Sequence, residues 1–237
     1  TNPLASDFGL LETITEAAGT ADAGTRRFEW DAAGNLAAAI DALNRRTDYT
    51  HDNLDRLTSV LLPDPDGAGP LARPIYTYAY SPADDLVKIV APDGGLTERF
   101  YDGRHRLVTE VRPDPDGEGG TPPPIWRWAF DAAGQLTTII NPLGHETRRA
   151  YDVRGLLTSS TLPDPDGDGD LQSPVYTYSH DAIGNVVSAT DPLGAVTSYV
   201  YDARGRVTRI IGADPDGLEP FLGPVTEFAW NAAGELT

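Results

Sequence analysis

The strongest candidate for chemistry in this chain is a run of acidic residues at every second position between residues 164 and 170. The segment reads Asp164-Pro165-Asp166-Gly167-Asp168-Gly169-Asp170. Hard cations such as Ca²⁺ prefer oxygen ligands presented by a loop of this kind. The sequence therefore predicts a calcium site whose ligands are Asp164, Asp166, Asp168 and Asp170.

Two observations count against a complete calcium site there. Val175 stands at the twelfth position of the loop, where a calcium loop carries Glu. The related segments that begin at residues 64, 114 and 214 do not keep all four acidic residues. The alternative interpretation is that Pro-Asp-Gly only builds a turn, because Pro fixes φ and Gly accepts a positive φ.

Other side chains that could do chemistry do not converge. The four histidines, His51, His105, His145 and His180, show no spacing typical of a metal or catalytic group, so we expect structural roles. Acid pairs such as Asp84-Asp85 lie in polar segments, whereas a catalytic pair needs one carboxyl group shielded from water. We therefore expect no enzyme activity, and no cofactor apart from calcium at the acidic loops.

The composition restricts the partners. The 237 residues carry a net charge of −18, which makes nucleic acid an unfavourable partner. No apolar run approaches 18 residues, so no membrane span is expected. The chain has no cysteine, so disulfides cannot hold it together.

A repeated motif, aromatic-Asp-x-x-Gly-x-aliphatic, organises the chain that must position these residues. We call its first position the aromatic slot and the four residues after it the aspartate turn. The slot is filled by Trp30, His51, Tyr80, Tyr101, Phe130, Tyr151, His180, Tyr201 and Trp230, at spacings that alternate between 21 and 29 residues. Two copies thus make a 50-residue unit, which is the signature of a repeat architecture.

Each copy of the motif predicts a β-hairpin. The segment before the slot alternates aromatic and other side chains, as in Ile125-Trp126-Arg127-Trp128-Ala129-Phe130, which is typical of a strand with one buried face. The aspartate turn then combines an acceptor side chain with a positive-φ residue. Its repeat residues include Asp31 and Gly34, Asp102, Asp131 and Gly134, Asp152 and Gly155, Asp181 and Gly184, Asp202 and Gly205, and Gly234. Asp55, Asp84 and His105 replace the glycine in three copies, and these residue types tolerate positive φ.

Two kinds of connection join the hairpins. The short one, Asp191-Pro192-Leu193-Gly194 and its relatives at 41, 91 and 141, we call the proline turn. The long loop contains Asp-Pro-Asp-Gly at 64, 114, 164 and 214. Hairpins joined in this way predict an all-β fold, an array of antiparallel hairpins that forms one continuous spiralling strip. We expect the array to cover residues 28–237, with residues 1–27 an irregular leading segment of a preceding repeat.

The paired signatures, Tyr-Asp-x-x-Gly-Arg-aliphatic and Asp-Pro-Leu-Gly-x-x-Thr, resemble the YD-repeat or RHS-repeat family over about residues 28–237. That family includes bacterial Rhs-type toxins, the cocoon subunits of insecticidal toxin complexes, wall-associated proteins and teneurins. The resemblance implies a hollow shell, tube or fibre on a secreted or cell-surface protein. In the toxin members the shell encloses a C-terminal toxic domain. No residue of the family's self-cleaving segment can be placed here, because nothing after Trp230 matches that segment.

Three functional hypotheses follow. The first is a structural scaffold, either a shell around a C-terminal cargo domain or a filament built by neighbouring repeats and self-association. The second is a module that binds glycans or calcium, in which aromatic side chains such as Tyr76, Tyr78, Trp126 and Trp128 would stack on sugars rather than pack in a core. The third, an enzyme, has no converging residues. Because the chain begins without Met and stops within a repeat, we expect it to be a piece of a longer polypeptide, whose open strand edges would make it associate.

Overall fold

The computed structural model describes residues 10–16, 24–67, 69–117, 119–167, 169–214 and 223–237. These residues form β-strands joined by turns and loops, which confirms the all-β, antiparallel fold class. Within this described part there is no helix long and apolar enough to cross a membrane. The chain divides into two compact units, residues 1–125 and 126–237.

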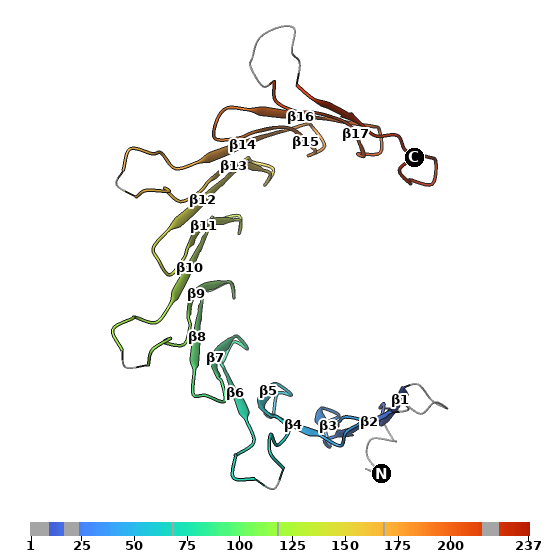
Figure 1. The fold of residues 1–237 in the computed structure, drawn as a ribbon, viewed down its shortest axis with the longest axis vertical. Helices are drawn as coiled ribbons and strands as arrows, with labels where there is room; N and C mark the ends of the chain where they lie inside the picture. The colour runs from blue at the N-terminus through green and yellow to red at the C-terminus, as the bar shows by residue number, and fades with distance from the viewer. Residues whose placement is uncertain (1–9, 17–23, 68, 118, 168, 215–222) are drawn as a thin grey trace. The chain divides into compact units, whose positions relative to one another are not determined.

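The first unit is a ladder of consecutive antiparallel strands (Figure 1). Its strands are β1 (Thr13–Glu16), β2 (Gly24–Trp30), β3 (Leu36–Ile40), β4 (Arg46–His51), β5 (Leu57–Leu61), β6 (Ile75–Tyr80), β7 (Leu86–Val90), β8 (Leu96–Tyr101) and β9 (Leu107–Val111). Each pairs with the next along the chain, without a crossover. Contacts are therefore local in sequence, as in a repeat array.

The second unit repeats this arrangement. Its strands are β10 (Ile125–Phe130), β11 (Leu136–Ile140), β12 (Glu146–Tyr151), β13 (Leu157–Thr161), β14 (Val175–His180), β15 (Val186–Thr190), β16 (Val196–Tyr201), β17 (Val207–Ile211) and β18 (Val225–Glu227). Consecutive strands again pair antiparallel. The last copy of the motif forms only an isolated bridge between Trp230 and Leu236.

A bulge follows every aspartate turn that joins two strands. In the β10–β11 hairpin, Phe130 faces Leu136 and Ala129 faces Thr138, so Thr137 is one extra residue on the outgoing strand. Its hydroxyl donates to the Ala129 carbonyl at 3.2 Å. The extra residue puts Leu136 and Ile139, three positions apart, on the same face as Phe130 and Trp128. The bulge therefore keeps the apolar residues of both strands on one face of the sheet.

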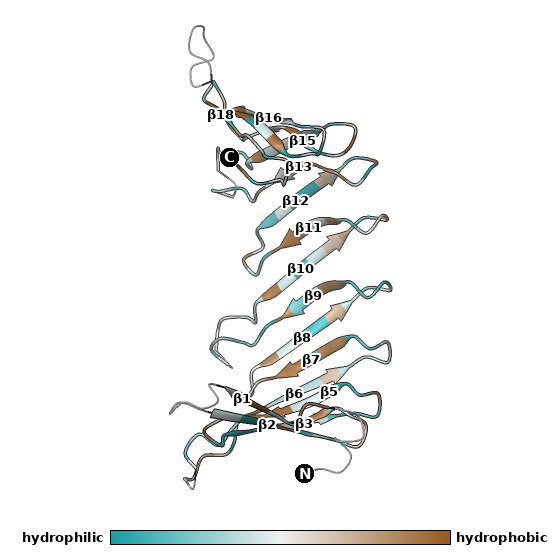
Figure 2. Cartoon of the chain, turned by 90° about the vertical axis from the view of Figure 1, so that its right-hand side faces the viewer, coloured by the Kyte–Doolittle hydropathy of each residue, from teal (hydrophilic) through white to brown (hydrophobic). Residues whose placement is uncertain are grey.

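The sheet is a single layer, and its apolar face is only partly covered. Aromatic-slot side chains are half-buried, while alternate residues such as Arg127 and Ala129 are exposed. Among the described residues, Ala38, Ile40 and Glu110 are the only ones classed as buried. Figure 2 shows brown hydrophobic stretches together with white and teal stretches on the strands of each unit. The core is thus a stripe of cross-strand contacts rather than an enclosed interior.

The structure begins to be regular ahead of the array boundary expected at residue 28. Strand β1, Thr13–Glu16, pairs with β2, whose first residue is Gly24. Residues 1–9 and 17–23 of the leading segment lie outside the described residues.

Candidate functional site

The aspartate turn and the proline turn have the same geometry. In each, the first residue donates its N–H to the carbonyl four residues on and accepts from the N–H three residues on, as at Asp131 and Asn141. The first side chain closes the same loop: Oδ1 of Asn141 accepts from Leu143 and His145 at 3.0 and 2.9 Å. The turn within each hairpin and the short turn that joins it to one neighbour therefore have the same geometry, and the sequence signal in most copies is Asp or Asn followed by Gly three residues later.

The fourth turn position has positive φ in all nine aspartate turns, between 60° and 98°. In the three copies without glycine, the fourth residue contacts the side chain of the residue that directly follows the preceding turn. Asn35 donates to Asp55 at 2.7 Å, Arg56 donates to Asp84 at 2.6 Å, and His105 Nδ1 lies 3.0 Å from an Asp85 oxygen. These contacts offset the cost of a left-handed conformation at a residue with a Cβ.

An arginine directly after an aspartate turn binds the first residue of that turn, and Arg56 and Arg206 also contact the next turn. Arg206 donates to Asp202 Oδ2 at 2.8 Å, lies over the Trp230 ring at 5.4 Å, and donates to the Asn231 carbonyl at 3.3 Å. Arg106 bonds Asp102 in the same way, and its guanidinium lowers the pKa of Asp102 from 3.8 to about 2. Side-chain contacts thus link the four aspartate turns of the first unit in succession, and in the second unit they link the turn at 152 to that at 181 and the turn at 202 to that at 231.

Side chains in the aromatic slot join neighbouring hairpins. The Tyr151 hydroxyl donates to the Leu136 carbonyl at 2.9 Å, and the Tyr201 hydroxyl donates to the Val186 carbonyl at 2.8 Å. In each case the acceptor is the first residue of the outgoing strand of the previous hairpin. The same contact is made by Tyr80, Tyr101 and, through Nε1, Trp230. The sequence showed the aromatic repeat but not this role, whose signal is a polar-tipped ring 15 or 23 residues after a strand start.

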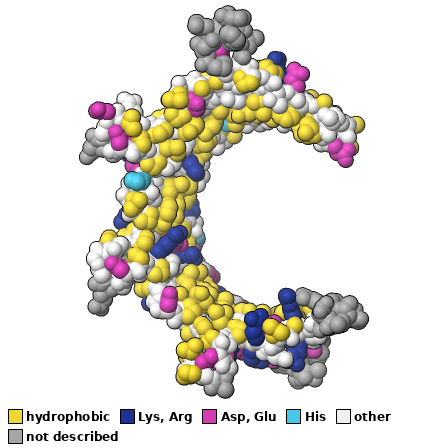
Figure 3. Space-filling view, in the orientation of Figure 1, with side chains coloured by type: hydrophobic (Ala, Val, Ile, Leu, Met, Phe, Trp, Pro, Cys, Tyr) yellow, Lys and Arg dark blue, Asp and Glu magenta, His cyan; other side chains and the backbone are white. Residues whose placement is uncertain are grey.

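The candidate calcium loop uses its first two aspartates to close itself. Asp164 Oδ1 accepts from the Asp166 N–H at 3.2 Å, and Asp166 Oδ2 accepts from the Leu171 N–H at 3.1 Å. The loops at 64 and 114 make the same pair of bonds although their later residues differ. Asp170 is exposed, and Asp168 lies outside the described residues. Figure 3 shows acidic side chains on the projecting loops of each unit.

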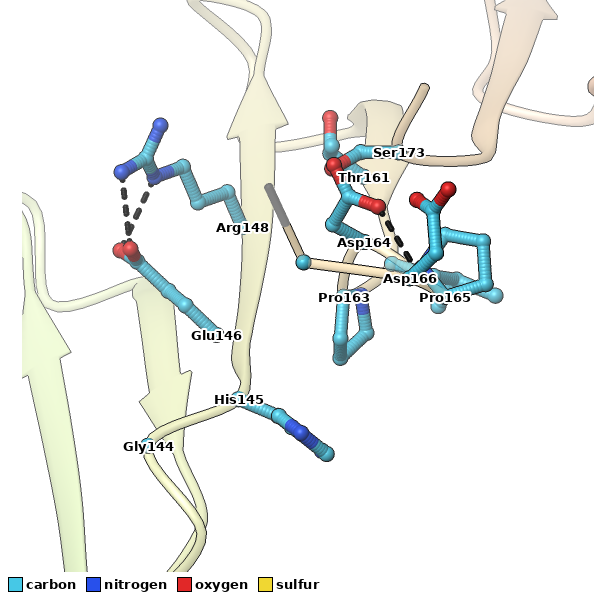
Figure 4. A pocket seen from close by; sticks show the side chains of 12 residues that line it. Gly144, His145, Glu146, Arg148, Thr161, Pro163, Asp164, Pro165, Asp166 and Ser173 are labelled. Atoms are coloured by element: carbon cyan, nitrogen blue, oxygen red, sulfur yellow. Dashed lines mark hydrogen bonds and ion pairs between the residues drawn. The ribbon is translucent and has the colours of Figure 1, made fainter. Parts of the chain in front are cut away.

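A cavity of about 570 Å³ separates this loop from the neighbouring proline turn (Figure 4). One wall carries His145, Glu146 and Arg148, and the other carries Asp164 and Asp166. Arg148 forms an ion pair with Glu146 at 2.7 Å, so its positive charge is balanced by a residue on the same side of the cavity. No group of three or more His, Asp or Glu side chains that could hold a metal ion occurs in the described ranges. The structure brings Asp164 and Asp166 together, and Asp170 does not line this cavity.

The histidines do not meet. His51 and His180 are half-buried in aromatic slots, His105 stands at the fourth turn position, and His145 follows a proline turn. Among these four histidines, only His105 has a carboxylate partner within the described part of the chain, and that partner is Asp85. Their positions in separate hairpins leave no common site for a metal or a substrate.

Comparisons with known proteins place this geometry in a family. The sequence model of the RHS Repeat family matches residues 30–67, 130–168 and 175–217, which together make up just over half of the chain. No curated protein matches the sequence.

Three solved structures show a similar fold. The crystal structure of TcdB2-TccC3 superposes with a TM-score of 0.58 at 15% identity, over 92% of this chain and 14% of that one. TcdB2-TccC3 without its hypervariable C-terminal region superposes with a TM-score of 0.55 at 18% identity, over 92% of this chain and 10% of that one. A Photorhabdus luminescens Tc holotoxin pore superposes with a TM-score of 0.57 at 15% identity, over 92% of this chain and 13% of that one. This chain therefore spans about an eighth of the length of two of these proteins and a tenth of the third. With half of its sequence matched and its hairpins in the same arrangement, the chain belongs to the RHS-repeat family.

Proposed function

We propose that this chain is a segment of a non-catalytic structural scaffold, a wall of β-hairpins in a secreted or cell-surface protein. The observation that carries the proposal is the linkage between successive hairpins within each unit. Strand pairing, arginine side chains at the turns and slot hydroxyls all connect one hairpin to the next. Within the described residues, the side chains that make these contacts do not converge on a common reactive site.

A shell that encloses another polypeptide is the form of scaffold best supported. The toxin-complex structures named above have the same hairpin fold, and one was solved without a hypervariable C-terminal region. A single-layer sheet whose aromatic face is only half-covered fits a wall with a second polypeptide on one side. The enclosed C-terminal cargo and the export of the protein are both part of this proposal.

The test is electron cryomicroscopy of the protein expressed from its complete reading frame, combined with limited proteolysis. A shell predicts closed, hollow particles in which a C-terminal segment resists protease until the wall is denatured. Open particles with an accessible C-terminal segment would refute the enclosure. Immunolabelling of unbroken cells, compared with lysed cells, tests the surface location separately.

A filament is the second candidate, and one observation favours it. In unit 2 every slot strand before β18 has six residues and every outgoing strand has five, so the period is constant. A constant period gives a constant rise and rotation per repeat, which a fibre requires. The same micrographs separate the candidates, because a fibre shows a regular axial repeat.

Binding at the surface is proposed only as an accessory property. For calcium, the candidate is the long loop with Asp164, Asp166 and Asp170, two of which already accept backbone N–H groups. Calcium that binds the folded state must raise the melting temperature. An unchanged melting temperature after addition of calcium or of a chelator would remove this proposal, and an empty glycan array would remove sugar binding.

A further inference from the structure

Two arginines fifty residues apart occupy the same place in their repeats but have different surroundings. Arg99 faces Glu110 across the β8–β9 pair, and Arg149 faces Ser160 across the β12–β13 pair. Both lie two residues before an aromatic-slot tyrosine, and strand alternation puts them on the aromatic face with that tyrosine. The difference at the facing position decides what each guanidinium meets.

In the first unit the place is filled by an internal carboxylate. Arg99 Nε donates to Glu110 Oε2 at 2.9 Å, and Arg112 Nε donates to Oε1 at 2.8 Å. Glu110 is one of the most buried residues described, with 7% of its surface exposed. Burial alone raises the pKa of Glu110, but the two arginines outweigh it and the pKa is lowered. The carboxylate is therefore held as an anion on the aromatic face.

In the second unit the corresponding carboxylate is missing. Ser160 replaces the glutamate, and Leu162 stands where the second arginine would be. Arg149 is half-buried, and its side chain forms no hydrogen bond or ion pair with any residue in the described part of the chain. Ser160 pairs in turn with Tyr176 on β14, so Arg149, Ser160 and Tyr176 occupy facing positions on three neighbouring strands. Shielding a cation without a partner anion is unfavourable.

We propose that Arg149 and Ser160 form a binding site for a carboxylate supplied from outside this chain, namely the Glu or Asp side chain of a polypeptide laid on the aromatic face. We infer a carboxylate ligand from the first unit, where Arg99 at the same position of its repeat binds the side chain of Glu110. The apolar and aromatic neighbours suit a peptide more than a free small anion. The site does not depend on whether the scaffold is a shell or a filament.

The first experiment supplies the carboxylate from within. Ser160→Glu recreates the facing pair of the first unit, and Ser160→Gln is its matched control of the same size without charge. We expect Ser160→Glu to melt about 2–4 °C above Ser160→Gln, and Arg149→Gln to abolish this difference. Equal melting temperatures for the two variants would overturn the proposal.

The second experiment supplies the carboxylate from outside. The blocked peptide acetyl-Leu-Glu-Leu-amide should shift the side-chain Nε–Hε resonance of Arg149, assigned with Arg149→Lys, while acetyl-Leu-Gln-Leu-amide should not. Ser160→Glu should block the shift, because its own carboxylate fills the place. A shift with methyl glucuronide and none with the peptide would refute the polypeptide ligand, and a peptide shift that persists in Ser160→Glu would refute the site.

Discussion

Removing one slot hydroxyl should weaken the link between two neighbouring hairpins without disturbing either hairpin. In Tyr151→Phe the ring and its packing remain, and only the donor to the Leu136 carbonyl is lost. That bond is 2.9 Å long and partly buried, and an uncharged hydrogen bond of this kind contributes about 1 kcal/mol net. For a chain of this size we expect the melting temperature to fall by about 2–4 °C.

A matched control separates the hydrogen bond from the loss of any tyrosine hydroxyl. Tyr199 is also half-buried on a strand of the second unit, and its hydroxyl has no hydrogen bond among the described residues. Tyr199→Phe should therefore change the melting temperature by less than 1 °C. The assay is thermal unfolding followed by circular dichroism, with urea unfolding to give the free energy.

The converse substitution tests the same reasoning in the opposite direction. His180 fills an aromatic slot in the second unit, and the Leu157 carbonyl lies 23 residues earlier, the same separation as between Tyr80 and its acceptor Leu57. His180→Tyr should therefore stabilise the chain by up to about 1 kcal/mol. If Tyr151→Phe and Tyr199→Phe have equal effects, or His180→Tyr destabilises, the slot hydroxyl does not join hairpins.

Three further predictions follow from the turns and loops. Asp84→Gly alone should change the free energy of unfolding little, because the relief of positive φ offsets the lost ion pair with Arg56. In an Arg56→Ala background, where that ion pair is already absent, the same substitution should stabilise the chain by about 0.5 kcal/mol. Urea unfolding of the four proteins measures the difference, and equal effects in both backgrounds would contradict a link between Arg56 and Asp84. Stability should be constant near neutral pH and fall with acidification, because the pKa of Asp102 is about 2 in the folded chain and 3.8 ordinarily. The contribution of Asp102 to stability is therefore complete above pH 3.8 and is lost as the pH falls through 2. Asp102→Asn should make a pH titration of the melting temperature less steep, and an unchanged slope would count against this role. Asp164→Ala should loosen the third long loop, since its carboxylate accepts the Asp166 N–H, and hydrogen exchange should increase there but not in the equivalent loop at 114.

The sequence was sufficient to predict the strands and the turns. The period-two aromatic segments and the glycine spacing are local signals, and the strands that flank the aspartate turns end and begin where the pattern predicts, as at Phe130 and Leu136. The exceptions are β1, which lies in the segment expected to be irregular, and β18, which ends at Glu227, before Trp230. Positive φ at Asp55, Asp84 and His105 was also predictable, because few residue types tolerate it. Local signals suffice here because each turn closes on its own residues.

The contacts between hairpins could not be predicted in the same way. The bond from Tyr151 to Leu136 depends on the register across β11 and β12 and on the bulge at Thr137, and neither is visible in a local pattern. The same holds for the aspartates of the candidate calcium loop, where sequence spacing gave the ligand types but not the backbone N–H groups that Asp164 and Asp166 accept. The alternating pattern predicts strands with one buried face, but the slot residues are only half-buried, because no second layer covers a single-layer sheet.

The most direct test of the account is the removal of one whole period. Deleting residues 51–100 joins Thr50 to Tyr101, which restores the strand that the period requires. Deleting residues 51–75 removes half a period, including one aspartate turn and β5, and joins β4 directly to β6. If 50-residue units are equivalent parts of one array, the first deletion should keep a cooperative urea transition with an m-value reduced in proportion to its length, and the second should not. Loss of cooperative unfolding in both deletions would contradict the account.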